Sequence, residues 1–371
     1  MRSTDIRPAD RPAPAGAEAG PRRVRGAIAA AGLWSAAALA AGLYWAVGGA
    51  GFPFGDNDPM DGISILAGLS PTTGGALVAG AGAVGVAVAA GMAAPWTGHR
   101  RPAVRAALLW PAWVLAAILT VVVVDYRVLV HVTYSLVYLL GGFVFADGPP
   151  PWPWHVVAQV LSLAGGTVWA AAALAYRART KRMVAGRMVA GRGDAPAGWT
   201  SPAAAARWGR WAVGVAIVVP ILYAAVRWTW ALGIPVGVDE EFFREGQESG
   251  LWRVGGVLGT LAVGGALLTL GLAQRWGEVF PRWVPWLAGR RVPVTLATVP
   301  AMLVAVLVTG AGLMFIRLTA TGYFEGTVFD RAGLWATVGP ELLWPLWGSA
   351  LGAAALAYHL RRRGGQPVTT A

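Results

Sequence analysis

Stretches of about 20 predominantly apolar residues recur along the chain and alternate with short polar segments. A bilayer-spanning helix needs about 20 apolar residues, since each residue advances about 1.5 Å through a hydrocarbon core of about 30 Å. Only helices and closed barrels satisfy all backbone groups within that core, and runs of this length favour helices. The pattern predicts an all-α integral membrane protein with about eight spans, at residues 27–47, 73–94, 105–124, 154–175, 209–232, 253–273, 294–316 and 340–358.

Residues 128–145 form a further apolar run that is harder to interpret. The run carries the polar residues His131, Thr133, Tyr134, Ser135 and Tyr138. It lies between two basic segments, residues 99–105 and 177–210, and an odd number of crossings between them would place these segments on opposite sides of the membrane. We therefore expect a re-entrant or interfacial segment on the extracytoplasmic face. A true span, with inverted topology in the rest of the chain, is the alternative.

The second half of the chain repeats landmarks of the first half. Residues 171–179 read AAALAYRAR and residues 353–361 read AAALAYHLR, which agree at seven of nine positions. Their tyrosines stand 358 − 176 = 182 residues apart, close to half of the 371 residues. The Trp-Ala-Val-Gly of residues 45–48 likewise corresponds to the Trp-Ala-Leu-Gly of residues 230–233. This period predicts two tandem four-helix units, in parallel orientation because each contains an even number of spans.

Charge placement predicts the topology and the domain organisation. Arginines cluster beside alternate ends of the apolar runs, whereas residues 48–72 contain no Lys or Arg and three aspartates. The positive-inside rule then gives a multi-pass protein of a bacterial cell (inner) membrane with both termini cytoplasmic. The predicted segments are a disordered cytoplasmic tail (1–26), a first four-helix unit (27–180), a basic cytoplasmic linker (181–207), a second four-helix unit (208–360) and a cytoplasmic tail (361–371).

Composition changes this picture little. A mean hydropathy of +0.55 and 13% charged residues exclude an ordinary soluble domain, in which about a quarter of the residues are charged. The net charge of +12 comes from arginines that flank membrane segments, so we expect no nucleic-acid partner. The absence of cysteine excludes disulfides and thiolate chemistry. A single lysine, Lys181, and the Ala/Gly/Val/Trp bias indicate a GC-rich coding genome.

Five charged residues lie within or at the edge of the predicted spans, where charge is costly and marks a functional candidate. They are Asp125, Arg127, Arg227, Arg317 and Glu341. All five fall towards the outer side in the predicted topology. One hypothesis is an outward-facing polar pocket in which Arg227 or Arg317 pairs with Asp125 or Glu341. The other is that these side chains reach the interface or form ion pairs that fix helix register.

Other candidate chemistry is sparse. His99 and His359 lie among arginines and are expected to be solvated, and His131 and His155 are interpreted as interfacial polar residues. None of them has ligands at metal-binding spacing, so the sequence predicts no metal site and no cofactor. Residues 56–62 lack calcium-loop spacing and indicate an acidic turn. Residues 239–248 predict a short helix on the outer surface, and small residues such as those at 75 and 79 or 348 and 352 predict close helix packing.

Two short aromatic motifs resemble those of a bacterial (actinobacterial-type) family of uncharacterised polytopic membrane proteins. Leu43-Tyr44-Trp45-Ala46-Val47-Gly48-Gly49 is similar to its Tyr/His-Trp-Ala-x-Gly-Gly motif, near the end of the first helix of a four-helix unit. Glu341-Leu342-Leu343-Trp344-Pro345-Leu346 is similar to an acidic stretch that opens its last helix, although Pro follows the aromatic residue directly. Residues 230–233 match the first motif only in part. The resemblance implies the four-helix unit, here in tandem, and no activity.

The sequence favours an accessory or structural membrane protein, because few polar residues lie within the predicted spans and no catalytic set can be assembled. The alternative is a transporter or binding protein for a small molecule or lipid, with an outward-facing polar pocket between the two repeats. An enzyme is the least favoured class. The expected partners are the lipid bilayer and a membrane-protein partner or further copies of the chain.

Overall fold

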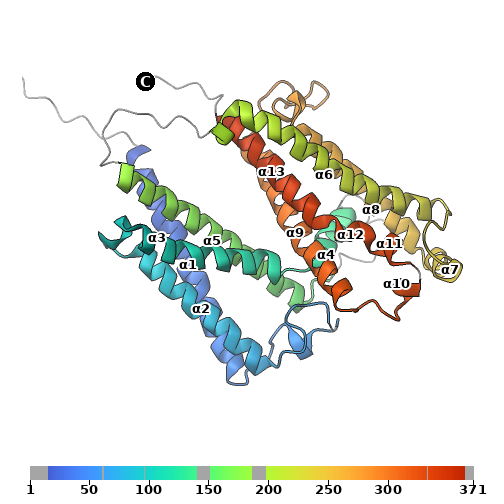
Figure 1. Ribbon diagram of the computed structural model, residues 1–371, viewed down its shortest axis with the longest axis horizontal. Coiled ribbons are helices and arrows are strands. Elements are labelled where there is room, and N and C mark those ends of the chain that lie inside the picture. Colours follow the sequence, from blue (N-terminus) through green and yellow to red (C-terminus); the bar gives the residue numbers. More distant parts are fainter. Residues whose placement is uncertain are drawn as a thin grey trace, which may run out of the picture. The chain divides into compact units, whose positions relative to one another are not determined.

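A computed structural model of the chain describes residues 16–60, 62–95, 97–139, 151–185, 198–331 and 333–363. Within these residues the structure is helical, and the only β-type pairing is a bridge between Val279 and Arg291 (Figure 1). Seven helical stretches are long and apolar enough to cross a membrane, as expected of a multi-pass membrane protein. They lie in α1 (Gly16–Ala46), α2 (Pro71–Ala93), α3 (Pro102–Ala117) continued by η3 (Ile118–Val122), α5 (Trp154–Ala185), α6 (Pro202–Ala231), α8 (Leu251–Gly271) and α9 (Val294–Ala320).

The eighth predicted span differs from the structure at its start. Three short helices, α10 (Val328–Arg331), α11 (Leu334–Thr337) and α12 (Gly339–Leu342), precede α13 (Trp344–Arg363). The predicted span of 340–358 therefore contains a break at Leu343, and Pro345 occupies the first turn of the new helix, where proline is tolerated. The helix α13 is not among the seven sufficiently apolar helices; its first turns contain Trp, Pro, Gly and Ser, and its last turns carry His359 and three arginines.

The ambiguous run at 128–145 begins as the short helix α4 (Tyr126–Leu139), and residues 140–145 lie outside the described residues. The expectation that this segment does not cross the membrane therefore stays a prediction. The described residues also contain short 3-10 turns: η1 (Gly55–Asn57), η2 (Thr97–Arg100), η5 (Gly198–Thr200) and η6 (Arg275–Gly277).

The chain forms two compact units, the first of which comprises residues 1–50, 72–117 and 164–190. Small residues bring its helices α1 and α2 together: a Cβ on Gly75 would lie 2.5 Å from the backbone nitrogen of Ala46. The predicted close packing at this position is therefore confirmed. Trp169 of α5 is fully buried, and its Nε1 donates a hydrogen bond of 3.1 Å to Ser35 Oγ of α1.

The second unit comprises residues 51–71, 118–163 and 191–371. Its centre is a bundle in which α13 packs on α6 and α9, and α6 packs on α8 (Figure 1). The bundle core contains Val213, Ala216, Leu272, Ala305, Leu351, Ala354 and Tyr358. A second core joins η3, α4 and the start of α5 to α9 through Val124, Val128, Val156, Leu163 and Leu307. The predicted helix at 239–248 is confirmed as α7 (Glu240–Glu248), capped by Asp239.

Corresponding landmarks of the sequence repeat have similar local structure in their own units. Tyr176 and Tyr358 are both fully buried. The hydroxyl of Tyr176 lies 2.8 Å from His99 Nδ1, and that of Tyr358 donates a 2.8 Å hydrogen bond to the carbonyl of Gly277. The expectation that His99 is solvated is wrong: the ring is 3% exposed, because Tyr176 and the carbonyl of Ala94 bind its two nitrogens.

Candidate functional site

The junction between η3 and α4 places a charged cluster in the second unit. The segment η3 is a π-helical turn, in which the N–H of Val123 bonds to the carbonyl of Ile118 at 2.9 Å. The chain then extends briefly before α4 begins at Tyr126. Asp125 precedes α4 as its cap, and its Oδ1 accepts a 3.0 Å hydrogen bond from the N–H of Arg127. Capping by a carboxylate satisfies a free helical N–H and complements the helix dipole.

The side chain of Arg127 connects two carboxylates. Its Nη2 lies 2.6 Å from Asp125 Oδ2, and its Nε donates to Asp125 Oδ1 at 3.0 Å, which makes this pair bidentate. Its Nη1 lies 2.6 Å from Oδ1 of Asp58, in the segment that follows η1. Arg127 is only 3% exposed and the Asp58 side chain 2%, so water screens these interactions little.

Gln159 of α5 adds a third segment to this cluster. Its Nε2 donates to Asp125 Oδ2 at 2.9 Å, and its Oε1 accepts from the N–H of Asp125 at 3.0 Å. Gln159 is fully buried. We call Asp58, Asp125, Arg127 and Gln159 the Arg127 cluster. It joins the segment after η1, the η3–α4 junction and α5.

The Arg127 cluster has one more negative than positive charge when both carboxylates are ionised. Burial raises the pKa of Asp58, but hydrogen bonds from Arg127 and from the N–H of Met60, together with the charge of Arg127, outweigh burial and leave this pKa below its ordinary value. The pKa of Arg127 is raised by the two carboxylates despite its burial. Asp58 Oδ2 is buried and has no hydrogen-bond partner among the described residues.

A small cavity of about 160 Å³ lies beside this cluster and brings two of the candidate residues together. Asp125 and Arg317 supply its charged lining, and residues of η3, α9 and the segment at 63–65 supply the rest. The guanidinium of Arg317 donates to the carbonyls of Gly62 and Ile63. This volume is below the range of about 300–1,000 Å³ that is typical of pockets for drug-sized ligands.

The other two candidate residues form a separate pair. Arg227 Nη2 of α6 lies 2.7 Å from Glu341 Oε1 of α12, and the two side chains are 16% and 6% exposed. The guanidinium also lies over the rings of Tyr223 and Trp230, with its carbon 4.9 and 4.7 Å from their centroids. Stacking and pairing together offset the cost of burying the charge. Neither Arg227 nor Glu341 lines the cavity of Asp125 and Arg317.

Two members of the Arg127 cluster were not anticipated. Asp58 was interpreted as part of an acidic turn, since nothing in the sequence indicates that it meets Arg127, 69 residues away. Gln159 could have been identified from the sequence, because a strongly polar residue within a predicted span is a functional candidate. In the described ranges no group of three His, Asp or Glu residues could hold a metal ion. No protein-family model, curated protein or solved structure matches the chain.

Proposed function

We propose that this chain is a polytopic membrane protein with an accessory or structural role, in which the buried charges hold the protein together. One observation supports this most: each of the five candidate charges bonds to another segment of the second unit. Arg127 and Asp125 connect three segments, Arg227 connects α6 to α12, and Arg317 connects α9 to the backbone at 62–63. Breaking a buried ion pair by removing one partner is strongly destabilising, as expected of groups with a structural role.

The proposal includes two tandem four-helix units of parallel orientation in a bacterial cell membrane, with both termini cytoplasmic. Support comes from the repeat landmarks. The buried tyrosines of α5 and α13 both contact the connection between the second and third long helices of their half. Both α1 and α6 end on Trp-Ala and are followed by a glycine with a φ near +90° (Gly48 and Gly233). Glycine favours this left-handed conformation after a helix.

The same landmark supports the proposed family resemblance. Trp45-Ala46 ends α1, where the Tyr/His-Trp-Ala-x-Gly-Gly motif of that bacterial family is expected. The acidic motif at 341–346 falls across the α12–α13 junction. In the family this motif opens the last helix. In this chain its glutamate, Glu341, lies in the short helix α12, directly before the last helix α13.

An accessory role is tested by purifying the full chain from its native membrane in a mild detergent. We expect a native mass above the 38.5 kDa of one chain, owing to a membrane-protein partner or further copies, and no thermal stabilisation by water-soluble solutes. A solute-binding protein behaves differently, because a ligand at 100 times its Kd stabilises the folded state by about 2.7 kcal/mol. A single-chain mass together with stabilisation by one solute would contradict the accessory role.

A second candidate function is the binding of a small solute with an anionic group at the Asp125–Arg317 cavity. It is favoured by one observation: two opposite charges line the same small cavity, and an arginine has five N–H donors. A solute that stabilises the wild-type chain but not Arg317→Gln would support this function. Arg253→Gln, an exposed arginine at the start of α8, is the matched control.

A further inference from the structure

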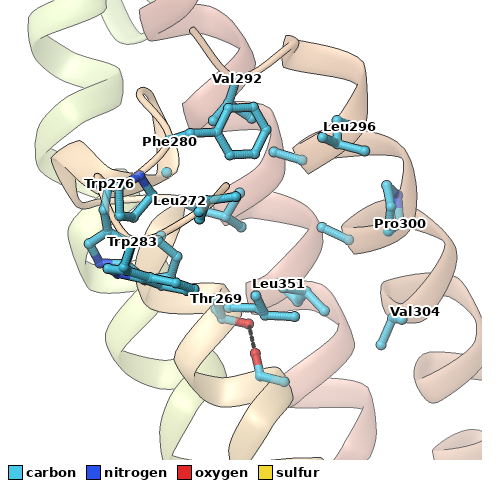
Figure 2. Close-up of a pocket in the computed structure, with 18 of the residues that line it drawn as sticks. Thr269, Leu272, Trp276, Phe280, Trp283, Val292, Leu296, Pro300, Val304 and Leu351 are labelled. Atoms are coloured by element: carbon cyan, nitrogen blue, oxygen red, sulfur yellow. Dashed lines mark hydrogen bonds between the residues drawn. The ribbon is translucent and has the colours of Figure 1, made fainter. Parts of the chain in front are cut away.

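A second cavity, larger than that of Asp125 and Arg317, lies at the opposite end of α9 from Arg317 and belongs to the second unit. It has a volume of about 460 Å³ and is bounded by the end of α8, the connection at 272–293, the start of α9 and two side chains of α13 (Figure 2). Among its lining side chains are Leu268, Phe280, Trp283, Leu296 and Val304. The hydroxyl of Thr269 is already satisfied by the carbonyl of Gly265 at 2.8 Å. The cavity therefore offers an almost wholly apolar surface.

Hydrogen bonds shape the connection that forms one wall of this cavity. The N–H of Phe280 bonds to the carbonyl of Arg290, and the N–H of Val292 bonds to that of Glu278, both at 2.9 Å. These bonds form a hairpin from residue 278 to residue 292. Arg362 of α13 fixes its base by donating to the carbonyl of Val292 at 2.9 Å, beside an ion pair with Glu278. The wall is thus built before any ligand arrives, which lowers the cost of binding.

Three exposed arginines border the apolar wall. Each of Arg275, Arg282 and Arg291 is the chain neighbour of a lining residue, namely Trp276, Trp283 and Val292. Neighbouring Cα atoms are about 3.8 Å apart, so the side chains of these arginines start next to the cavity lining. Trp283 and Trp286 of the same hairpin are 81% and 91% exposed. Exposed tryptophan and arginine between two apolar helices are typical of a segment at the level of lipid headgroups.

We propose that this cavity binds an acyl chain of an anionic phospholipid and that the rim arginines hold its phosphate. The apolar lining matches the acyl chain, and the cluster of positive charge matches the headgroup. Trp347 of α13 also contributes to the lining. This site is independent of the accessory role proposed above, which can fail without affecting it.

The proposal is tested on the delipidated full chain in detergent, by native mass spectrometry after addition of phosphatidylglycerol and phosphatidylcholine with identical acyl chains. We expect the wild-type chain to retain phosphatidylglycerol. Ala301→Phe, which fills the cavity from α9, abolishes retention. Val299→Phe is the matched control, because Val299 lies on the same helix, is 61% exposed and does not line the cavity. Equal retention by Ala301→Phe and the wild-type chain would overturn the cavity as the site.

The headgroup is tested separately with exposed residues, whose substitution does not threaten folding. Arg282→Gln and Arg291→Gln should each weaken phosphatidylglycerol binding about fivefold, since each arginine near an anionic surface contributes by a factor of this order. Arg244→Gln in α7 should not. If the wild-type chain retained phosphatidylcholine as well as phosphatidylglycerol, the proposed preference for an anionic headgroup would be wrong. If it retained a free fatty acid equally well, the proposed phospholipid occupant would be wrong.

Discussion

At the scale of single residues, Arg127 carries the clearest physical constraint. A guanidinium that is 3% exposed is costly to bury, and only close pairing with carboxylates offsets this cost. Asp125 alone satisfies Nε and Nη2, and Asp58 satisfies Nη1 from a distant segment. The planar fork of arginine matches this bidentate geometry, and lysine would not reproduce it.

Removal of Arg127 should therefore destabilise the protein strongly. Arg127→Met leaves two buried carboxylates without a counter-charge, and we expect a loss of about 3–5 kcal/mol in the free energy of unfolding. Thermal unfolding in detergent measures it, with the exposed Arg253→Met as the control. Adding Asp58→Asn and Asp125→Asn to Arg127→Met should recover much of the loss. An unchanged unfolding temperature in the single variant would show that the cluster is not stabilising.

The lowered pKa of Asp58 predicts a pH dependence of stability. A carboxyl whose pKa is lower in the folded than in the unfolded chain stabilises the fold above its unfolded pKa, and this contribution is lost as the pH falls through the folded value. The difference in unfolding temperature between wild-type and Asp58→Asn chains should be largest near pH 7 and shrink below about pH 4. The exposed Glu245→Gln should show no such trend. A constant difference from pH 7 to pH 3 would contradict the assigned pKa.

At the scale of elements, the contact between α9 and α13 depends on one glycine. A Cβ on Gly348 of α13 would lie 2.5 Å from the carbonyl oxygen of Ala305 and 3.0 Å from the nitrogen of Thr309, both in the backbone of α9. Real Cβ atoms do not approach backbone atoms so closely, so any larger residue must push the helices apart. Small residues serve this purpose at helix interfaces in membranes.

Gly348→Val should thus destabilise the bundle by about 1–3 kcal/mol, the usual cost of overpacking. Gly214→Val in α6 is the matched control, since nothing lies within 4 Å of a Cβ at that position. Thermal unfolding of the two variants in the same detergent gives the comparison. Similar losses in both would assign the effect to helix propensity and not to the α9–α13 contact.

The sequence located seven of the long helices because a bilayer requires length and apolarity, and both are visible in a linear pattern. It misplaced only the start of the predicted span at 340–358, since an apolar run does not show that the chain breaks at Leu343 and that α13 begins at Trp344. It also could not show the π-turn of η3, whose Ile-Leu-Thr-Val-Val would fit an α-helix equally well. Helix continuity depends on backbone packing, such as that of η3 against Gly310.

At the scale of the whole molecule, the sequence identifies the charged candidates, because charge within a membrane span is costly. It does not identify their partners, since the bond from Arg127 to Asp58 spans 69 residues of chain and joins a loop to a helix. Of the two hypotheses drawn from the sequence, one places the five candidates around a single pocket and the other assigns them to ion pairs or interfacial positions. Asp125 and Arg317 share a cavity, whereas Arg227 and Glu341 form a pair of their own.

The predicted topology can be tested directly, because the chain contains no cysteine. In intact cells, a membrane-impermeant thiol reagent should label Glu241→Cys in α7 and should not label Arg290→Cys in the hairpin unless the cells are opened. Both positions are exposed. The reverse result would mean that residues 128–145 cross the membrane and invert the topology downstream.

The π-turn of η3 absorbs one residue of the chain between α3 and α4. A π-turn accommodates one more residue than an α-helical turn, so the residues after it keep nearly the orientation that ordinary winding with one residue fewer would give them. Deletion of one of the five residues of η3 would restore an α-helical turn and leave Asp125 facing Gln159 and the loop that carries Asp58. The ion cluster thus tolerates at this turn a change of chain length that a regular helix would pass on as a rotation of about 100°.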